Sequence, residues 1–354
     1  MSGITTRRQE MVREWLEEQG LDALLVSAEP NVRWLTGFAG EGLLVLDASG
    51  VSICTDSRYA IQARDEAPDA EVLADGGHLE QAIGRLNADG VGRFGFESAY
   101  LSYASHRKLC EGLDEAEPVP VEDKIKRLRA VKDEAEIALI EQAATIADRA
   151  FVALRPMLPG MCERDAAFEL HRLMVKEGAE KPSFDIIVAS GPNGAKPHAC
   201  PCERRISEGD FIVIDWGAVV EGYCSDCTRT VIVGQPDGRQ REIWEAVREA
   251  QLAAIAGVRP GAVCREVDEI ARGLLRERGF DREFGHGLGH GVGLQVHELP
   301  VLSQRSEDAA LEAGMVVTVE PGVYIEDWGG VRLEELVLVT QEGHRSLTAA
   351  PYDL

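Results

Sequence analysis

Two segments that follow residue 150 resemble each other, and this internal repeat most constrains the fold. LRPMLPGMCERDAAFELHRLMVKEGA is similar to VRPGAVCREVDEIARGLLRERGF. Cys162 and Cys264 occupy matching places before a helical pattern, and strand-rich segments follow each copy. Two such copies predict a pseudo-symmetric domain with one core and a site between its halves. The alternative is that two helices share a start sequence by chance.

Length and charge narrow the class of protein. The 354 residues suffice for two domains or one large one. The 61 acidic and 37 basic residues give a formal charge of -24, which argues against nucleic-acid and anionic-membrane surfaces. The polar N-terminal stretch lacks the apolar core of a signal peptide, and no apolar run approaches the roughly 20 residues that span a bilayer. We therefore expect a cytoplasmic protein without nucleic-acid or membrane partners.

The order of elements predicts two domains. Residues 1–123 alternate short helical and strand patterns, typical of a small α/β domain, with a hairpin around Asp47 to Gly50. EPVPVEDK is interpreted as a linker. One long helical pattern then runs from Lys124 to Leu154 and opens an α+β domain over residues 124–354.

The stretch EGYCSDCTRT contains a C-x-x-C, so either two sulfurs or the intervening Asp226 could carry chemistry. The β-branched residues that follow predict a strand, in which Cys224 and Cys227 point to opposite faces. A thiolate pair needs a tight turn instead. A zinc site that also uses Cys200 and Cys202 remains the alternative.

The same stretch predicts a hairpin that pairs two carboxylates. DFIVIDWGAVV and YCSDCTRTVIV flank a turn, and a hairpin centred near Val220 and Glu221 puts Asp215 opposite Asp226. Directly opposite residues share one face of a sheet. Facing carboxylates repel each other unless a cation lies between them, so we predict a metal site here.

A second hairpin repeats this arrangement. VVTVEPGVYI and GVRLEELVLV are apolar strand patterns, and Glu320 and Glu334 are equidistant from Asp327 between them. We expect these two glutamates to face the same site, and Glu335 to be an exposed neighbour.

A glycine-rich stretch, FGHGLGHGVGLQVHELP, holds His286, His290 and His297. The glycines exclude a stable helix, so the histidines are not a helical metal-binding pair. Small residues instead let the backbone approach a substrate or metal closely. A lone histidine is usually structural, but three of the chain's eight within this stretch indicate a site.

Carboxylates together with imidazole suit manganese, cobalt, iron or zinc rather than a thiolate-selected ion. This many carboxylates indicates two ions that share ligands, which activate a bridging water as nucleophile and polarise a carbonyl oxygen. The residues therefore predict metal-assisted hydrolysis.

At these residues the chain resembles the pita-bread metallopeptidases of family M24, which include Xaa-Pro dipeptidase (prolidase), Xaa-Pro aminopeptidase and methionine aminopeptidase. The resemblance covers Leu128 to about Thr348 and rests on five motifs in order: SFDIIVASGPNGAKPHA, VIDWGAVVEGYCSDCTRT, FGHGLGHGVGLQVHE, VEPGVYI and GVRLEELVLV. PNVRWLTGF and TDSRYAIQA are similar to the smaller creatinase/prolidase-type domain. The resemblance implies a pita-bread catalytic domain after that smaller domain.

The resemblance also implies ligands and roles. Asp215 would bind one ion and Asp226 and Glu334 would bridge both, while His290 and Glu320 would bind the other. Glu320 would also transfer a proton, and His198 and His297 would hydrogen-bond the scissile carbonyl or the oxyanion. His286 and Tyr324 would shape the proline pocket, and Arg332 would orient a carboxylate ligand.

By the same resemblance we expect a homodimer that cleaves a small peptide with proline at P1′, using a hydroxide that bridges two manganese, cobalt or zinc ions. Xaa-Pro dipeptidase is the first hypothesis, because the chain ends soon after Glu334 and the first domain is compact. Xaa-Pro aminopeptidase and a non-catalytic binding protein on the same fold are the alternatives.

Overall fold

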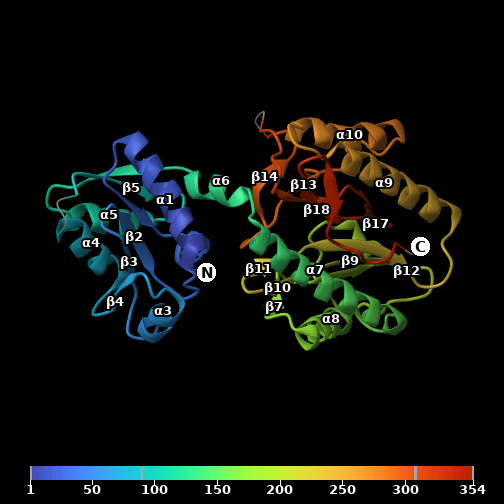
Figure 1. The fold of residues 1–354 in the computed structure, drawn as a ribbon. Coiled ribbons are helices and arrows are strands. Elements are labelled where there is room, and N and C mark those ends of the chain that lie inside the picture. Colours follow the sequence, from blue (N-terminus) through green and yellow to red (C-terminus); the bar gives the residue numbers. More distant parts are fainter. Residues whose placement is uncertain (1, 89–90, 307–308, 353–354) are drawn as a thin grey trace. The chain divides into compact units, whose positions relative to one another are not determined.

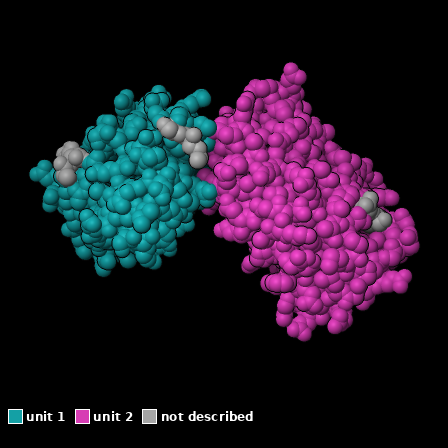
Figure 2. Space-filling model, turned by 60° about the horizontal axis from the view of Figure 1, so that its bottom comes forward, with its two compact units in different colours: residues 1–129 teal, residues 130–354 magenta. Residues whose placement is uncertain are grey.

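The computed structural model describes residues 2–88, 91–306 and 309–352 (Figure 1). Its contacts divide the chain into two compact units, residues 1–129 and 130–354, which Figure 2 colours separately. The sequence places the boundary six residues earlier, after residue 123. In the part of the chain that the structure describes, no helix is long and apolar enough to cross a membrane.

Unit 1 is built on one six-stranded sheet with the order β4-β3-β2-β1-β5-β6. Its strands are β1 (Ala23–Val26), β2 (Leu43–Asp47), β3 (Val51–Cys54), β4 (Glu71–Leu73), β5 (Arg93–Glu97) and β6 (Glu117–Val121). Its helices are α1 (Ser2–Gln19), α2 (Glu29–Thr36), α3 (Ala60–Glu66), α4 (His78–Ala88) and α5 (Tyr103–Gly112), followed by α6 (Lys124–Ala130) at the division. Leu25, Val45 and Phe94 belong to its buried core.

Two sequence predictions fall in unit 1. The hairpin at Asp47 to Gly50 is confirmed, because β2 and β3 pair antiparallel with Leu46 opposite Val51. The linker prediction for EPVPVEDK is wrong over residues 117–121, which form β6 parallel to β5. β6 is an edge strand, where proline is tolerated because one side of the backbone needs no ladder bonds.

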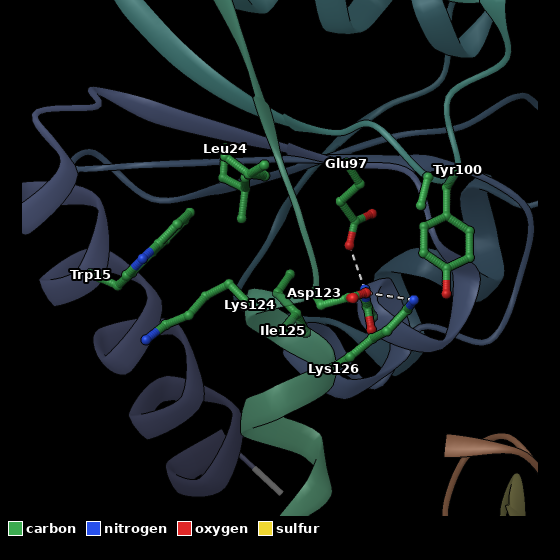
Figure 3. Close-up of a pocket in the computed structure, with 11 residues that line it drawn as sticks. Trp15, Leu24, Glu97, Tyr100, Asp123, Lys124, Ile125 and Lys126 are labelled. Carbon is green, nitrogen blue, oxygen red and sulfur yellow. Dashed lines mark hydrogen bonds and ion pairs between the residues drawn. The ribbon is translucent and has the colours of Figure 1, made fainter. Parts of the chain in front are cut away.

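A small pocket lies among α1, β5 and the start of α6 (Figure 3). Its polar groups are already partnered within unit 1. The Lys124 ammonium lies 5.7 Å from the centre of the Trp15 ring, and the Lys126 ammonium 5.2 Å from that of Tyr100. Glu97 accepts hydrogen bonds from the backbone at residues 27 and 28. The two lysine contacts join the first turn of α6 to α1 and to the segment after β5.

Unit 2 carries the repeated segments. Its helices are α7 (Glu134–Leu154), η1 (Arg155–Met157), α8 (Glu163–Glu177), η2 (Gly191–Ala195), α9 (Gly238–Gly257) and α10 (Cys264–Glu277). Its strands are β7 (Lys181–Pro182), β8 (Ile187–Ser190), β9 (Phe211–Trp216), β10 (Ala218–Val220), β11 (Tyr223–Cys224), β12 (Cys227–Ile232), β13 (Gly289–Gly291), β14 (Glu298–Leu302), β15 (Val316–Val319), β16 (Gly322–Ile325), β17 (Gly329–Arg332), β18 (Glu335–Val339) and β19 (His344–Ser346).

The strands of unit 2 lie between the pair α7–α8 and the pair α9–α10 (Figure 1). Each half has its own buried cluster, one with Phe151 stacked on Trp216 and the other with Val247 and Val317. The repeat is visible at the helix starts, where Cys162 forms an isolated bridge with Arg205 and Val263 one with Ala310. The pseudo-symmetric domain predicted from the repeat is present, but each half has its own hydrophobic cluster instead of the one core that was expected.

The single long helix predicted from Lys124 to Leu154 is two helices. Asp133 is the N-cap of α7, and its side chain and that of Glu136 form a reciprocal capping box. Such a box satisfies backbone donors at a new helix start, so α7 begins as a helix of its own.

Candidate active site

The first two predicted ligands come from β9 and from the residue before β12. Asp215 lies opposite Thr228, so the prediction that it lies opposite Asp226 is wrong. The turn explains the difference: Glu221 and Gly222 both have positive φ, 44° and 79°, and make a two-residue turn one position further along than predicted. Asp226 nevertheless lies near enough to Asp215 to be repelled by its charge.

The second predicted hairpin has the expected register. β15 pairs with β18 and β16 pairs with β17, with Val319 opposite Glu335 and Gly322 opposite Arg332. Both ladders are centred on Asp327, so Glu320 and Glu334 occupy facing positions between them.

His290, Asp226 and Glu334 converge at the centre of unit 2. Each offers one ligand atom, and these atoms all lie within 4.8 Å of one another. The Nε2 atom of His290 lies 3.6 Å from Asp226 Oδ2 and 3.3 Å from Glu320 Oε1. Its Nδ1 lies 3.1 Å from the Gly291 carbonyl, to which it donates, so Nε2 is the atom left for a ligand.

The remaining predicted ligand, Asp215, is held differently. Its Oδ2 accepts a hydrogen bond from Arg332 Nη2 at 2.5 Å in a buried ion pair. Its Oδ1 is buried and has no hydrogen-bond partner among the described residues.

The carboxylates strongly influence one another. Burial raises the pKa of Asp226, and the charges of Glu334 and Asp215 raise it further. Burial likewise raises the pKa of Glu334, with Glu320 adding to the rise. Burial alone would also raise the pKa of Glu320, but the hydrogen bond with His290 together with the nearby positive charges of His290 and Arg332 outweighs burial and lowers that pKa to about 2. A divalent cation would relieve this repulsion, because it would be the largest local charge.

Unpartnered oxygens identify where such a cation fits. Glu334 Oε2 accepts from Thr228 Oγ1 at 2.7 Å, whereas Glu334 Oε1 is buried without a partner among the described residues, as is Asp215 Oδ1. Buried polar atoms are normally hydrogen-bonded, and an exception requires an explanation. Two free carboxylate oxygens beside an imidazole are a donor set for manganese, cobalt or zinc. The residues present therefore fit divalent metal ions.

A chain of hydrogen bonds leads away from this cluster. Arg332 Nη1 donates to the Tyr324 hydroxyl at 2.8 Å, and that hydroxyl lies 3.0 Å from His286 Nε2. His286 Nδ1 lies 2.7 Å from the Gly287 carbonyl and donates to it, so Nε2 accepts from the tyrosine. Burial lowers the pKa of His286 and raises that of Tyr324 to about 12, which favours the neutral form of both.

The other two predicted histidines are exposed. The His297 ring centre lies 4.2 Å from that of His290, and partial desolvation of the His297 ring together with the His290 charge lowers the pKa of His297. His198 lies in the loop between η2 and β9, where the Pro197 carbonyl accepts from Arg332 Nη1 at 3.1 Å.

A buried network beside the site escaped sequence reasoning. Glu335, expected to be exposed, is 5% exposed, and Arg229 Nη2 donates to it at 2.8 Å. Arg229 also donates to the carbonyls of Ala350 and of the neighbouring Glu334. Tyr352 covers its guanidinium group, 3.8 Å from the ring centre. A charge in an apolar strand pattern indicates a buried partner, but the sequence does not identify that partner.

The cysteines take no part in the cluster. Cys224 and Cys227 are both buried but belong to different hydrophobic clusters. The single strand predicted through both is wrong, because Cys224 ends β11 and Cys227 begins β12 in another sheet. Burial raises the pKa of Cys227 well above its usual range, which keeps it a thiol. Among the described residues, the group of three metal-binding side chains contains no cysteine.

Comparison with known proteins agrees with this geometry. Residues 138–341 match the model of metallopeptidase family M24, and residues 8–131 match the creatinase/prolidase N-terminal domain. An Xaa-Pro dipeptidase from Pyrococcus horikoshii is 38% identical over 99% of both chains. The structure of an Xaa-Pro dipeptidase from Bacillus anthracis is 39% identical, with a TM-score of 0.95 over 99% of both chains. That of an X-Pro aminopeptidase from Thermotoga maritima is 36% identical, with a TM-score of 0.92 over 98% of both chains.

Proposed function

This chain belongs to metallopeptidase family M24, and from that premise we propose that it is an Xaa-Pro dipeptidase, a hydrolytic enzyme that cleaves the bond before proline. The observation that carries the proposal is the convergence of Asp226, His290 and Glu334, whose ligand atoms lie within 4.8 Å of one another. Two Xaa-Pro dipeptidases that match over nearly the whole of both chains support the choice of substrate.

We propose that two divalent ions, manganese, cobalt or zinc, are held by Asp215, Asp226, His290, Glu320 and Glu334. Such ions lower the pKa of a water molecule and polarise a carbonyl oxygen. The two unpartnered oxygens, on Asp215 and Glu334, support this ligand set.

Three side chains would carry out proton transfer and charge stabilisation. Glu320 lies against His290 in the cluster, and it would accept the proton of the attacking water and deliver it to the leaving proline nitrogen. His198 and His297 would donate hydrogen bonds to the scissile carbonyl and to the oxyanion that follows. Their exposure supports this role, because a substrate needs access to them.

His286, Tyr324 and Arg332 would form the wall of the proline pocket. Hydrogen bonds link the three side chains, and the neutral state of the first two suits contact with an apolar pyrrolidine ring. Arg332 would also orient Asp215 through their ion pair.

Xaa-Pro aminopeptidase activity on longer peptides is the second candidate. It is favoured by the likeness to the Thermotoga maritima enzyme, which is nearly as similar as the dipeptidases. The two candidates share the chemistry and differ in whether a residue follows proline.

One experiment tests both candidates. Metal-free protein receives manganese, cobalt or zinc, and the hydrolysis of Ala-Pro, Leu-Pro and Ala-Pro-Ala is measured. Cleavage of the dipeptides alone is the expected result. Cleavage of Ala-Pro-Ala before proline would establish the aminopeptidase instead, and no hydrolysis with any of the metals would overturn both.

The ligand set has its own test. Asp226→Asn should lose at least one bound ion and reduce activity by two orders of magnitude or more, because an amide neither carries the charge nor bridges two cations. Metal content is measured by mass spectrometry beside kcat. Glu326→Gln, an exposed change in the hairpin that joins β16 and β17, is the matched control. Full activity of Asp226→Asn would contradict the assignment.

Further expectations are part of the proposal. We infer a homodimer in the cytoplasm, with residues 1–123 and 124–354 as its two domains. The formal charge of -24 supports the absence of nucleic-acid partners.

A further inference from the structure

Two of the histidines proposed to contact substrate lie on loops, and each loop is tied to a buried carboxylate on a helix. We propose that Glu163 of α8 and Asp268 of α10 are positioning residues for the loops that carry His198 and His286. This inference rests on the proposed function, since it concerns how those histidines are aimed. Glu163 and Asp268 are both 0% exposed.

Glu163 joins three points of the loop over residues 190–202. Its Oε1 accepts from the backbone N–H and the hydroxyl of Ser190, at 2.6 and 2.7 Å. Its Oε2 accepts from the Asn193 side-chain amide at 2.8 Å. The same oxygen accepts from the backbone N–H and the thiol of Cys202, at 3.1 and 3.0 Å. One carboxylate therefore fixes the start, the middle and the end of the segment that contains His198.

This carboxylate cannot easily be replaced. Burying a carboxylate costs several kcal/mol unless donors surround it, and the five donors to Glu163 come from neutral groups. Every one of those contacts needs an acceptor. An amide offers one accepting oxygen and one donating nitrogen. The nitrogen of a glutamine at this position would therefore face hydrogen-bond donors and leave them without an acceptor.

Asp268 and Arg272 perform the equivalent task in the other half. Asp268 Oδ1 accepts from the Leu288 backbone N–H at 2.9 Å, and its Oδ2 accepts from Arg272 Nε at 2.9 Å. Arg272 in turn donates to the carbonyls of Phe284 at 3.0 Å and His286 at 2.8 Å. Side chains of α10 therefore hold the backbone of the loop over residues 284–288 at Phe284, His286 and Leu288.

The two anchored loops meet at one point. Arg332 Nη1 donates both to the Pro197 carbonyl, next to His198, and to the Tyr324 hydroxyl that contacts His286. A displacement of the His198 loop would therefore change the geometry of the proposed substrate wall without moving a predicted metal ligand. The His286 loop is joined to one such ligand, because the Leu288 carbonyl accepts a hydrogen bond from the Glu320 N–H at 2.8 Å. Misplacing a catalytic group by about 1 Å can cost roughly 100-fold in rate.

The test uses holoenzyme and the substrate Ala-Pro. Glu163→Gln should lower kcat about 10- to 100-fold while the protein keeps its full content of bound metal. Amide hydrogen exchange over residues 190–202 should become at least ten times faster, because the contacts that protect this segment are lost. Asp165→Asn, an exposed carboxylate in the same first turn of α8, controls for the loss of charge at the helix start and should leave kcat, metal content and exchange unchanged.

A double-mutant cycle separates positioning from mere stability. If Glu163 acts through His198, then Glu163→Gln should lower kcat by less than about threefold in a His198→Ala background. Additive losses, or an unchanged kcat in Glu163→Gln alone, would overturn the proposal. Asn193→Ala removes a single donor to Glu163 and serves as the second variant if Glu163→Gln does not fold. It should accelerate exchange over the same segment and lower kcat in the same His198-dependent way.

The second anchor has its own variant. Arg272→Met removes the donors to the Phe284 and His286 carbonyls but keeps a long apolar stem, and it should lower kcat/KM with metal content retained. A full kcat/KM would overturn the assignment for α10. Failure of the proposed function is distinguishable, since it would appear as an inactive wild-type protein, whereas the exchange measurement does not need activity.

Discussion

The carboxyl group of Asp148 on α7 makes the stability of unit 2 depend on pH. Burial raises its pKa to about 6, although its Oδ2 accepts a hydrogen bond from the Ala349 N–H at 2.6 Å. In the unfolded chain an aspartate has a pKa near 3.9. The stabilisation by protonated Asp148 is therefore complete below about pH 4 and is lost as the pH rises to about 6.

We predict that Asp148→Asn, which cannot ionise, gains stability relative to wild type as the pH rises from about 4 to 6, and that the difference is constant above about pH 7. The measurement is the urea midpoint of unfolding across this range. Asp165→Asn is exposed and should show a difference from wild type that does not change with pH. A constant difference for Asp148→Asn would contradict the assigned pKa.

Glu335 belongs to a buried network of an ion pair and hydrogen bonds beside the site, and it is not one of the proposed metal ligands. Its two oxygens accept from Arg229, Thr348 and Tyr352, at 2.8, 2.5 and 2.5 Å. Glu335→Ala should therefore destabilise the protein by about 3–5 kcal/mol, since it leaves a buried guanidinium unpaired. Denaturant unfolding measures this loss. Glu342→Ala, an exposed change after the same strand, should stay within about 0.5 kcal/mol, and equal effects of the two would argue against a buried network.

Among the elements, β13 depends on backbone contacts that only glycine permits. A Cβ on Gly289 would lie 2.0 Å from the Thr318 carbonyl oxygen, whereas a Cβ on Gly285 of the same stretch would meet nothing within 4 Å. Gly289→Ala should lower the free energy of unfolding by about 1–3 kcal/mol or more, because β13 or β15 must move to make room for the methyl group. Gly285→Ala should leave the thermal midpoint within about 2 °C. Similar midpoints for both variants would contradict the close pairing of β13 and β15.

The elements themselves could largely be read from the sequence. The hairpin around Asp327 has its predicted register, because equal strand lengths on either side of one turn determine which residues face each other. The hairpin through Glu221 does not, since the turn uses Glu221 and Gly222 at positive φ. A shift of one position in a turn moves the facing residue by two, and sequence alone does not select between adjacent turn positions.

What the sequence could not supply are contacts between distant segments. Arg229 and Ala350 are 121 residues apart, and Glu163 and Cys202 are 39 apart. Their side chains look like ordinary surface charges or thiols in the sequence. Only the packing of α8 against β8 and of β18 against β12 turns them into partners, so neither the Glu335 network nor the Glu163 anchor could be predicted.

At the scale of the whole molecule, the five proposed ligands all belong to unit 2. Manganese at 100 times its dissociation constant should stabilise the native state by about 2.7 kcal/mol, because the unfolded chain lacks the assembled site. Hydrogen exchange should slow in peptides that cover β9, β12 and β18 and stay unchanged in β1 and β2 of unit 1. Asp226→Asn should weaken the slowing. Equal slowing in both units would contradict a site confined to residues 130–354.

The long separation of partners also determines when activity can arise during translation. Unit 1 is one continuous segment, so it can fold while later residues are still being added at roughly 5–20 per second. Thr228 and Glu334 are 106 residues apart, and Arg332 and Asp215 are 117 apart. A ribosome stalled after residue 300 would carry Asp215, Asp226 and His290. The other two proposed ligands, Glu320 and Glu334, would not yet have been added. A nascent chain of this protein therefore lacks two of the five proposed metal ligands until its last strands emerge.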